Sequence, residues 1–125
     1  MKKVVNTVNA PAAIGPYSQG TVHGNTLYVS GQLPIDPATG ELVAGDIAVQ
    51  TTRAMENLKA IIEAAGGKME DVLKTTILLT DLANFVAVNG AYGAFFPDAP
   101  PARICYQVTA LPKGAEVEID AIVGL

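Results

Sequence analysis

Hydrophobic and polar residues alternate along two segments of the chain, residues 102–108 and 117–123. Successive side chains of a β-strand point to opposite faces, so this alternation predicts two strands that each bury one face. The faces expected in the core carry Ile104, Tyr106 and Val108 in the first strand and Val117, Ile119, Ala121 and Val123 in the second. The opposite faces carry Arg103, Cys105 and Gln107 in the first strand and Glu116, Glu118 and Asp120 in the second.

Residues 111–114, Leu-Pro-Lys-Gly, lie between these segments and predict a turn, so we expect the two strands to form an antiparallel hairpin. If both apolar faces contact one core, Arg103 stands opposite an even-numbered residue of the second strand. Glu118 or Asp120 is then its neighbour across the ladder.

The first half of the chain predicts further strands and one long helix. Val4 and Val5 mark a short strand, and Gly24-Asn25 predicts a tight hairpin between strands at 18–23 and 26–30. Residues 32–42 read as a surface excursion with at least one β-turn. Asp46 caps a helix that Gly66-Gly67 stops. Its inward face is expected to carry Ile47, Thr51, Ala54, Leu58, Ile61, Ile62 and Ala65.

A strand at 74–80 and a second helix follow. Asp81 or Asn84 caps this helix and Pro97 ends it. Its inward residues are expected to be Phe85, Val88, Tyr92 and Phe95. The pattern therefore predicts one α+β domain over residues 1–125, with about six strands and two helices on one face of the sheet. The other face must contact water or another subunit, which favours oligomerisation.

Composition narrows the function classes. The 125 residues carry a net charge of −4 and scattered lysines, so nonspecific nucleic-acid binding is not expected. Cys105 is the only cysteine, which excludes an internal disulfide and suits a reducing compartment. The start of the chain lacks the apolar stretch of a signal peptide, and no run approaches the ~18 apolar residues of a membrane span. We therefore expect a cytoplasmic protein without membrane contact.

Arg103 is the first candidate for chemistry, since it is one of only two arginines and emerges from the stiff Pro100-Pro101 step. Arg53, the other, lies in the long helix one turn from Glu56, an ordinary surface arrangement. From the pattern alone, Arg103 opposite a carboxylate indicates an ordinary cross-strand pair on a solvated face. The alternative is a site for a small anion.

Several separated motifs carry a resemblance to a known family. They are Asn9-Ala10-Pro11-Ala12-Ala13-Ile14-Gly15-Pro16-Tyr17, Gln19-Gly20, Ser30-Gly31-Gln32-Leu33-Pro34, Val88-Asn89, Pro101-Ala102-Arg103-Ile104-Cys105, Leu111-Pro112-Lys113 and Val117-Glu118-Ile119. In this order they resemble the reactive intermediate deaminases of the RidA, or YjgF, type across essentially the whole chain.

The resemblance implies a homotrimer of chorismate-mutase-like subunits with clefts between neighbours, which act on 2-imino and 2-enamino acids. It implies that Arg103 grips the substrate carboxylate, that Glu118 positions the hydrolytic water and that Tyr17 lies in the cleft. Substrate contacts are expected from Ser30, Gly31, Asn89 and the backbone carbonyl of Cys105. A guanidinium fork can hold a planar carboxylate by two hydrogen bonds, and a carboxylate can take a proton from water. No cofactor or metal is implied.

Rival interpretations remain for single residues and for the whole chain. A Cys105 nucleophile is disfavoured because His23, the only histidine, has no sequence connection to it, and His23 is expected on the surface. Without the resemblance, Tyr17 is a loop aromatic, and Glu118 is one of three acids on a solvated face. Residues 96–101 form a shorter approach to Arg103 than in many relatives, so side-chain preference stays open. A regulatory module that binds small carboxylates is the alternative function, followed by a ribonuclease or translation inhibitor.

Overall fold

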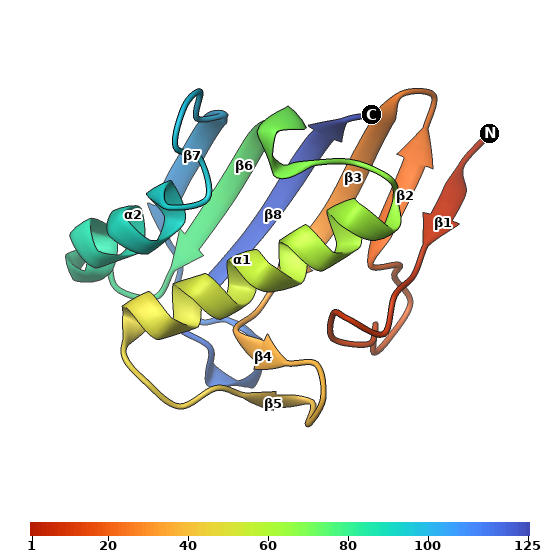
Figure 1. The fold of residues 1–125 in the computed structure, drawn as a ribbon. Coiled ribbons are helices and arrows are strands. Elements are labelled where there is room, and N and C mark those ends of the chain that lie inside the picture. The colour runs from red at the N-terminus through yellow and green to blue at the C-terminus, as the bar shows by residue number, and fades with distance from the viewer.

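A computed structural model describes residues 1–125. Its main sheet has six strands in the order β1-β2-β3-β8-β6-β7, and both helices lie on one face of it (Figure 1). The sheet strands are β1 (Lys3–Val5), β2 (Gly20–His23), β3 (Thr26–Gln32), β6 (Val72–Leu79), β7 (Ala102–Gln107) and β8 (Val117–Gly124). The other elements are the short hairpin of β4 (Ile35–Asp36) and β5 (Glu41–Leu42) and the helices α1 (Ile47–Ala64) and α2 (Phe85–Gly93). The predicted α+β sheet with two helices on one face is confirmed.

Strands β1, β2 and β3 form an antiparallel meander, and β3 continues into an antiparallel pair with β8. Gly24 has a φ of 60°, the left-handed conformation that the predicted tight turn requires. The pairing of β3 with β8 shifts register between Val29 and Gln32. This bulge leaves Ser30 and Gly31 outside the regular ladder.

Helix α1 begins and ends where its sequence predicts. The Asp46 side chain accepts a hydrogen bond of 3.0 Å from the backbone N–H of Val49, and Gly66 leaves the helix with a φ of 83°. The predicted inward residues from Ile47 to Ile62 are buried, and together with Met55 they pack against β8 and β3. Full burial of a leucine or isoleucine side chain contributes roughly 1.5–3 kcal/mol to the stability of the fold.

The hairpin predicted between residues 102–108 and 117–123 is wrong. Strand β7 pairs in parallel with β6, and β6 separates it from β8 (Figure 1). The reason is the helix: β6, α2 and β7 form a strand-helix-strand crossover, which returns the chain in the same direction beside the strand it left. The turn at 111–114 then carries the chain back to the other side of β6.

The face assignment of β7 is also wrong. Arg103 aligns with Thr75, which is buried against α2, so Arg103 lies on the helix side of the sheet. Ile104 and Tyr106, predicted in the core, are 47% and 50% exposed on the opposite side. Because Glu118 aligns with Leu78 on that opposite side, Arg103 and Glu118 face away from each other across the sheet.

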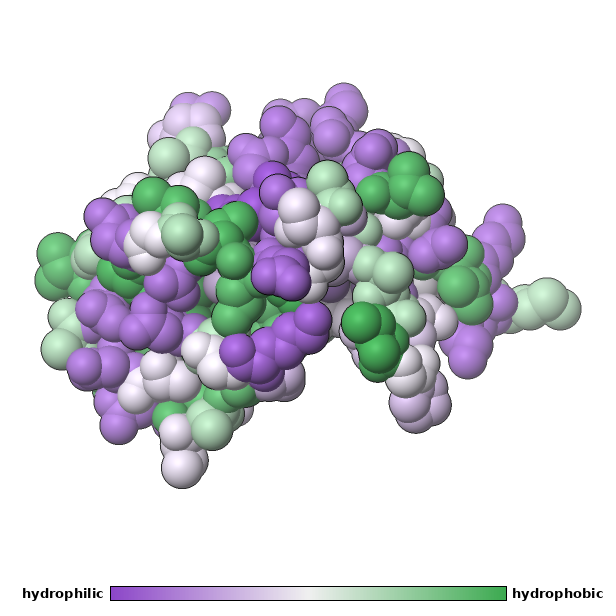
Figure 2. Space-filling model, turned by 90° about the horizontal axis from the view of Figure 1, so that it is seen from below, coloured by the Kyte–Doolittle hydropathy of each residue, from purple (hydrophilic) through white to green (hydrophobic).

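The sheet face without helices is called the open face below. It carries the half-exposed apolar residues Tyr28, Ile104 and Tyr106 and the partly buried Leu78 beside the acids Glu118 and Asp120. Figure 2 shows a different side, the underside of the molecule as drawn in Figure 1, where apolar residues form separate patches among hydrophilic ones and a hollow lies between a main body and a smaller lobe. No helix has the length and apolarity needed to cross a membrane.

Candidate functional site

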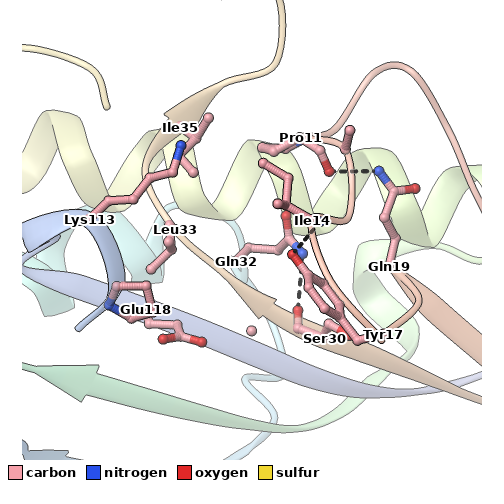
Figure 3. Close-up of a pocket in the computed structure, with 13 residues that line it drawn as sticks. Pro11, Ile14, Tyr17, Gln19, Ser30, Gln32, Leu33, Ile35, Lys113 and Glu118 are labelled. Atoms are coloured by element: carbon pink, nitrogen blue, oxygen red, sulfur yellow. Dashed lines mark hydrogen bonds between the residues drawn. The ribbon is translucent and has the colours of Figure 1, made fainter. Parts of the chain in front are cut away.

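A pocket of about 520 Å³ lies where the loop before β2, the end of β3 and the turn before β8 converge (Figure 3). Its lining is partly apolar and partly polar, and it includes four of the residues predicted for a site, Tyr17, Ser30, Gly31 and Glu118. The remaining lining residues are Pro11, Ala12, Ile14, Gln19, Gln32, Leu33, Ile35, Pro112 and Lys113. A concave, mixed lining of this kind is typical of a small-molecule site.

The carboxylate of Glu118 reaches the pocket across the backbone of Gly31. A Cβ atom built on Gly31 would overlap Oε2 of Glu118 and lie 2.8 Å from its carboxyl carbon. Gly31 lies in the bulge of β3, where the chain leaves the regular ladder with β8. The missing side chain at Gly31 therefore creates the space that Glu118 occupies.

Glu118 is half-buried and its surroundings disfavour its negative charge. Burial raises the pKa of the Glu118 carboxyl above its ordinary value, and the like charge of Asp120 raises this pKa further. The two acids and Gly31 also line a smaller cavity of about 90 Å³. A carboxyl with a raised pKa can both accept and return a proton nearer neutral pH than an exposed one.

Tyr17 and Ser30 are held by the loop that precedes β2. The Tyr17 hydroxyl accepts a 3.3 Å hydrogen bond from the backbone N–H of Ile14 (Figure 3). Ser30 Oγ donates to the backbone carbonyl of Ser18 at 2.5 Å, which leaves its lone pairs free to accept. Both hydroxyls are thus fixed at the pocket wall.

Arg103 lies at the opposite end of the sheet, against α2. Its Nη1 donates a 2.8 Å hydrogen bond to Oδ1 of Asn89, and its guanidinium carbon lies 5.4 Å from the ring centroid of Phe85 and 5.2 Å from that of Tyr92. The one ion pair of the chain joins Lys68 and Glu70, so Arg103 has no carboxylate partner. A half-buried, oriented guanidinium without an internal anion is suited to bind an external one.

Cys105 lies on the same face of β7 as Arg103 and packs at the margin of the core. Burial raises the pKa of its thiol, and the charge of Arg103 lowers this pKa by less. The thiol therefore stays protonated near neutral pH. His23 is exposed at the end of β2.

The predicted site residues fall into two sets that one chain does not bring together. The pocket set comprises Tyr17, Ser30, Gly31 and Glu118, and the edge set comprises Asn89, Arg103 and Cys105. Strand β6 lies between β8, which carries Glu118, and β7, which carries Arg103 and Cys105, and the two sets also lie on opposite faces of the sheet. The prediction from strand alternation that Glu118 or Asp120 neighbours Arg103 across the ladder is therefore wrong.

Residues that the sequence reasoning missed shape the pocket as well. Gln19 is buried, and its carboxamide accepts from the Thr7 N–H at 2.7 Å and donates to the carbonyls of Thr7 and Pro11 at 3.0 and 2.8 Å. Lys113 has a φ of 60°, unusual for a residue with a side chain, and its Nζ donates to the Gly40 carbonyl at 3.2 Å. No sequence signal indicated the conformation of Lys113.

Possible metal ligands are dispersed. No three His, Cys, Asp or Glu side chains approach one another closely enough to hold a metal ion together.

Comparisons with known proteins identify relatives that extend over nearly the whole chain. A family model described as endoribonuclease L-PSP matches residues 7–125. The 2-iminobutanoate/2-iminopropanoate deaminase of Escherichia coli K12 is 50% identical over 125 residues, with 98% of this chain and 97% of that protein covered. A RutC family protein of Pyrococcus horikoshii is 50% identical over 122 residues, which cover 98% of this chain and 97% of that protein.

A solved structure adds a ligand to the comparison. The crystal structure of E. coli TdcF with bound serine has a TM-score of 0.94 and 43% sequence identity, and 98% of each chain is covered. Because the family model and the relatives both extend over nearly the whole sequence, the chain belongs to the YjgF/RidA family.

Proposed function

We propose that this protein hydrolyses reactive 2-imino and 2-enamino acids to 2-oxo acids and ammonia. The observation that carries the proposal is that two charged groups lack an ion-pair partner within the chain. One is the half-buried guanidinium of Arg103, and the other is the half-buried carboxyl of Glu118, which has a raised pKa and lines the pocket. A relative with 50% identity is named 2-iminobutanoate/2-iminopropanoate deaminase, which supports the same reaction class.

In this reaction Arg103 holds the substrate by its carboxylate. Asn89 fixes one N–H of the guanidinium at 2.8 Å, and the rings of Phe85 and Tyr92 restrict its tilt. The remaining N–H donors form the fork that a planar carboxylate accepts bidentately. The carboxylate of the serine bound by TdcF is the same kind of group.

Glu118 then serves as base and acid in turn. It accepts a proton from water while the water oxygen bonds to the imine carbon and the C=N electron pair moves to nitrogen. It returns this proton to the nitrogen, which gives the neutral carbinolamine. It then takes the proton of the carbinolamine hydroxyl and delivers it to the same nitrogen, so the C–N bond breaks with release of ammonia while the hydroxyl oxygen forms the new C=O bond. Imino acid and water thus give oxo acid and ammonia. Positioning and proton transfer suffice, since bound geometry alone can lower such a barrier by several kcal/mol.

A second subunit must bring the edge set to the pocket set. We propose a homotrimer in which Arg103, Cys105 and Asn89 of one subunit face Tyr17, Ser30, Gly31 and Glu118 of its neighbour. The half-exposed apolar residues of the open face, among them Tyr28 and Tyr106, support such an association because their burial is favourable. The assembly would shield the cleft from bulk water.

The family description also names an endoribonuclease activity. Neither residue set offers the clustered cations that RNA phosphates require, and the net charge of −4 opposes binding of a polyanion. A small carboxylate needs only Arg103. The charge distribution therefore favours the deaminase over the nuclease.

The test couples the protein to an amino-acid oxidase that generates imines and follows imine loss. Arg103→Ala and Glu118→Gln are each expected to lose most activity, whereas a mixture of the two, assembled by co-expression, should regain about a quarter of the wild-type value by random assortment in a symmetric oligomer. Arg103→Ala mixed with the Arg103→Ala, Glu118→Gln double variant is the control and should regain none. Unchanged imine loss in Arg103→Ala would contradict the mechanism, and ligand binding without turnover in the wild type would favour the regulatory module.

A further inference from the structure

The carboxamide of Asn57 is buried on the inward face of α1, between Ala54 and Ile61. Its Nδ2 donates to the backbone carbonyls of Leu33 and Ile35, at 3.0 and 2.8 Å. One side chain thus binds the segment that joins β3 to β4. A buried amide must satisfy its donors, so this side chain and the segment fix each other's positions.

The bound segment forms a wall of the pocket. Leu33 and Ile35 both line it, on the side across from Pro11 and Ile14 (Figure 3). Their apolar side chains leave from the same residues whose carbonyls Asn57 holds. Any shift of these two carbonyls therefore moves the wall relative to Glu118.

Arg53 fixes the direction of the Asn57 amide. Its Nε and Nη2 both donate to Oδ1 of Asn57, at 3.2 and 2.8 Å, so the Nδ2 group is directed at the segment. Because an amide could otherwise rotate and exchange its oxygen with its nitrogen, this contact selects the orientation with two donors toward the wall. Arg53 and Asn57 act as one unit beneath the pocket.

We propose that Asn57, oriented by Arg53, is a positioning residue for substrate side-chain selectivity. By holding Leu33 and Ile35 it keeps an apolar wall in place that favours 2-imino acids with longer aliphatic side chains. The inference rests on the proposed deaminase function, since it names the substrates that this pocket prefers. Apolar pockets discriminate by contact with each added methylene, so displacement of the wall weakens that discrimination.

The test uses Asn57→Asp, which keeps the size of the side chain and the acceptor for Arg53 but turns a carboxylate oxygen toward two carbonyls. The kcat/KM values are measured for the leucine-derived and the alanine-derived imine. Their ratio is independent of the fraction of folded enzyme, so a merely structural role would leave it unchanged. We expect the leucine-to-alanine ratio to fall at least about threefold.

Two further variants keep the test decisive. Arg53→Met frees the amide to rotate without a buried charge and should lower the ratio in the same direction even if Asn57→Asp does not fold. Gln50→Ala, also in α1, removes an amide that donates to Gly45 and Glu116 instead of to Leu33 and Ile35, and should leave the ratio unchanged. A ratio that stays at the wild-type value in folded Asn57→Asp or in Arg53→Met overturns the inference. Failure of the wild type to hydrolyse either imine would overturn the proposed function instead, which separates the two failures.

Discussion

The carboxylate of Glu118 lies in the space where the side chain of any residue other than glycine at position 31 would begin. A Cβ atom on Gly31 would overlap Oε2 of Glu118 and approach its Cδ to 2.8 Å. Gly31 does not have a positive φ, so the backbone itself would accept alanine. Glycine is therefore required at position 31 to leave room for the Glu118 carboxylate, and the backbone conformation does not require it.

We predict that Gly31→Ala lowers kcat about 10- to 100-fold, because displacement of a catalytic group by about 1 Å can have an effect of this size. The imine-loss assay measures it, and circular dichroism checks the fold. Gly93→Ala is the matched control, since nothing lies within 4 Å of a Cβ there, and it should keep wild-type kcat. Full activity of Gly31→Ala would mean that the position of Glu118 is unimportant.

The acidic limb of the pH–rate profile should reflect Glu118. Its raised pKa means that the carboxylate needed to accept the proton of water is lost as pH falls through that raised value. Asp120→Asn removes the like charge while retaining an oxygen for the Thr76 N–H, 2.9 Å away. We expect this variant to shift the acidic limb of kcat/KM to lower pH, and a shift to higher pH would contradict the assigned cause.

Glu118 should also cost stability at neutral pH. Its pKa is higher in the folded than in the unfolded chain, so folding is opposed above the folded pKa, where the group is ionised in both states. This cost disappears as pH falls below the unfolded pKa. We predict that Glu118→Gln raises Tm at neutral pH while it abolishes activity, and that the gain shrinks with falling pH. Thermal unfolding at several pH values measures this, and an equal gain at all of them would exclude ionisation as the cause.

The elements that could be predicted from sequence are those fixed by local signals. Asp46 and Gly66 bound α1 through a cap and a left-handed residue, and Gly24 sets the β2–β3 turn, because each needs only its chain neighbours. Asn57 has a local signal as well, since it is a polar residue at helical spacing between the apolar Ala54 and Ile61.

The placement of β7 in the sheet could not be predicted from such local signals. Strand pairing joins residues far apart in sequence, and alternation shows that a strand has two faces without showing which one meets the helices. In β7 the apolar face carrying Ile104 and Tyr106 is the exposed one, while Arg103 faces α2. Strand alternation therefore predicted Glu118 or Asp120 as the neighbour of Arg103, whereas the family resemblance implied separate roles for Arg103 and Glu118, which a second subunit can bring together.

Asn89 should control how readily Arg103 accepts a carboxylate. In Asn89→Asp a negative charge would replace the amide oxygen 2.8 Å from Nη1 and compete with the substrate for the guanidinium. We predict that KM rises about 10- to 100-fold, in line with the loss of one charge-assisted interaction, while kcat changes less. Asn89→Ala, which adds no charge, should raise KM by a smaller factor. An unchanged KM in Asn89→Asp would show that Arg103 does not bind the substrate carboxylate.

Cys105 offers the sharpest distinction between covalent and noncovalent chemistry. Burial raises the pKa of its thiol, so the thiolate that a covalent mechanism needs is scarce at neutral pH. We predict that Cys105→Ala retains kcat within about threefold, since a backbone carbonyl survives the substitution, whereas loss of a true nucleophile would cost orders of magnitude. Imine loss measures this, with thiol alkylation as a second readout. Alkylation of the wild type should be slow near neutral pH and faster as pH rises above the ordinary thiol range. A Cys105→Ala variant that folds but loses activity as completely as Glu118→Gln would assign the thiol a catalytic role.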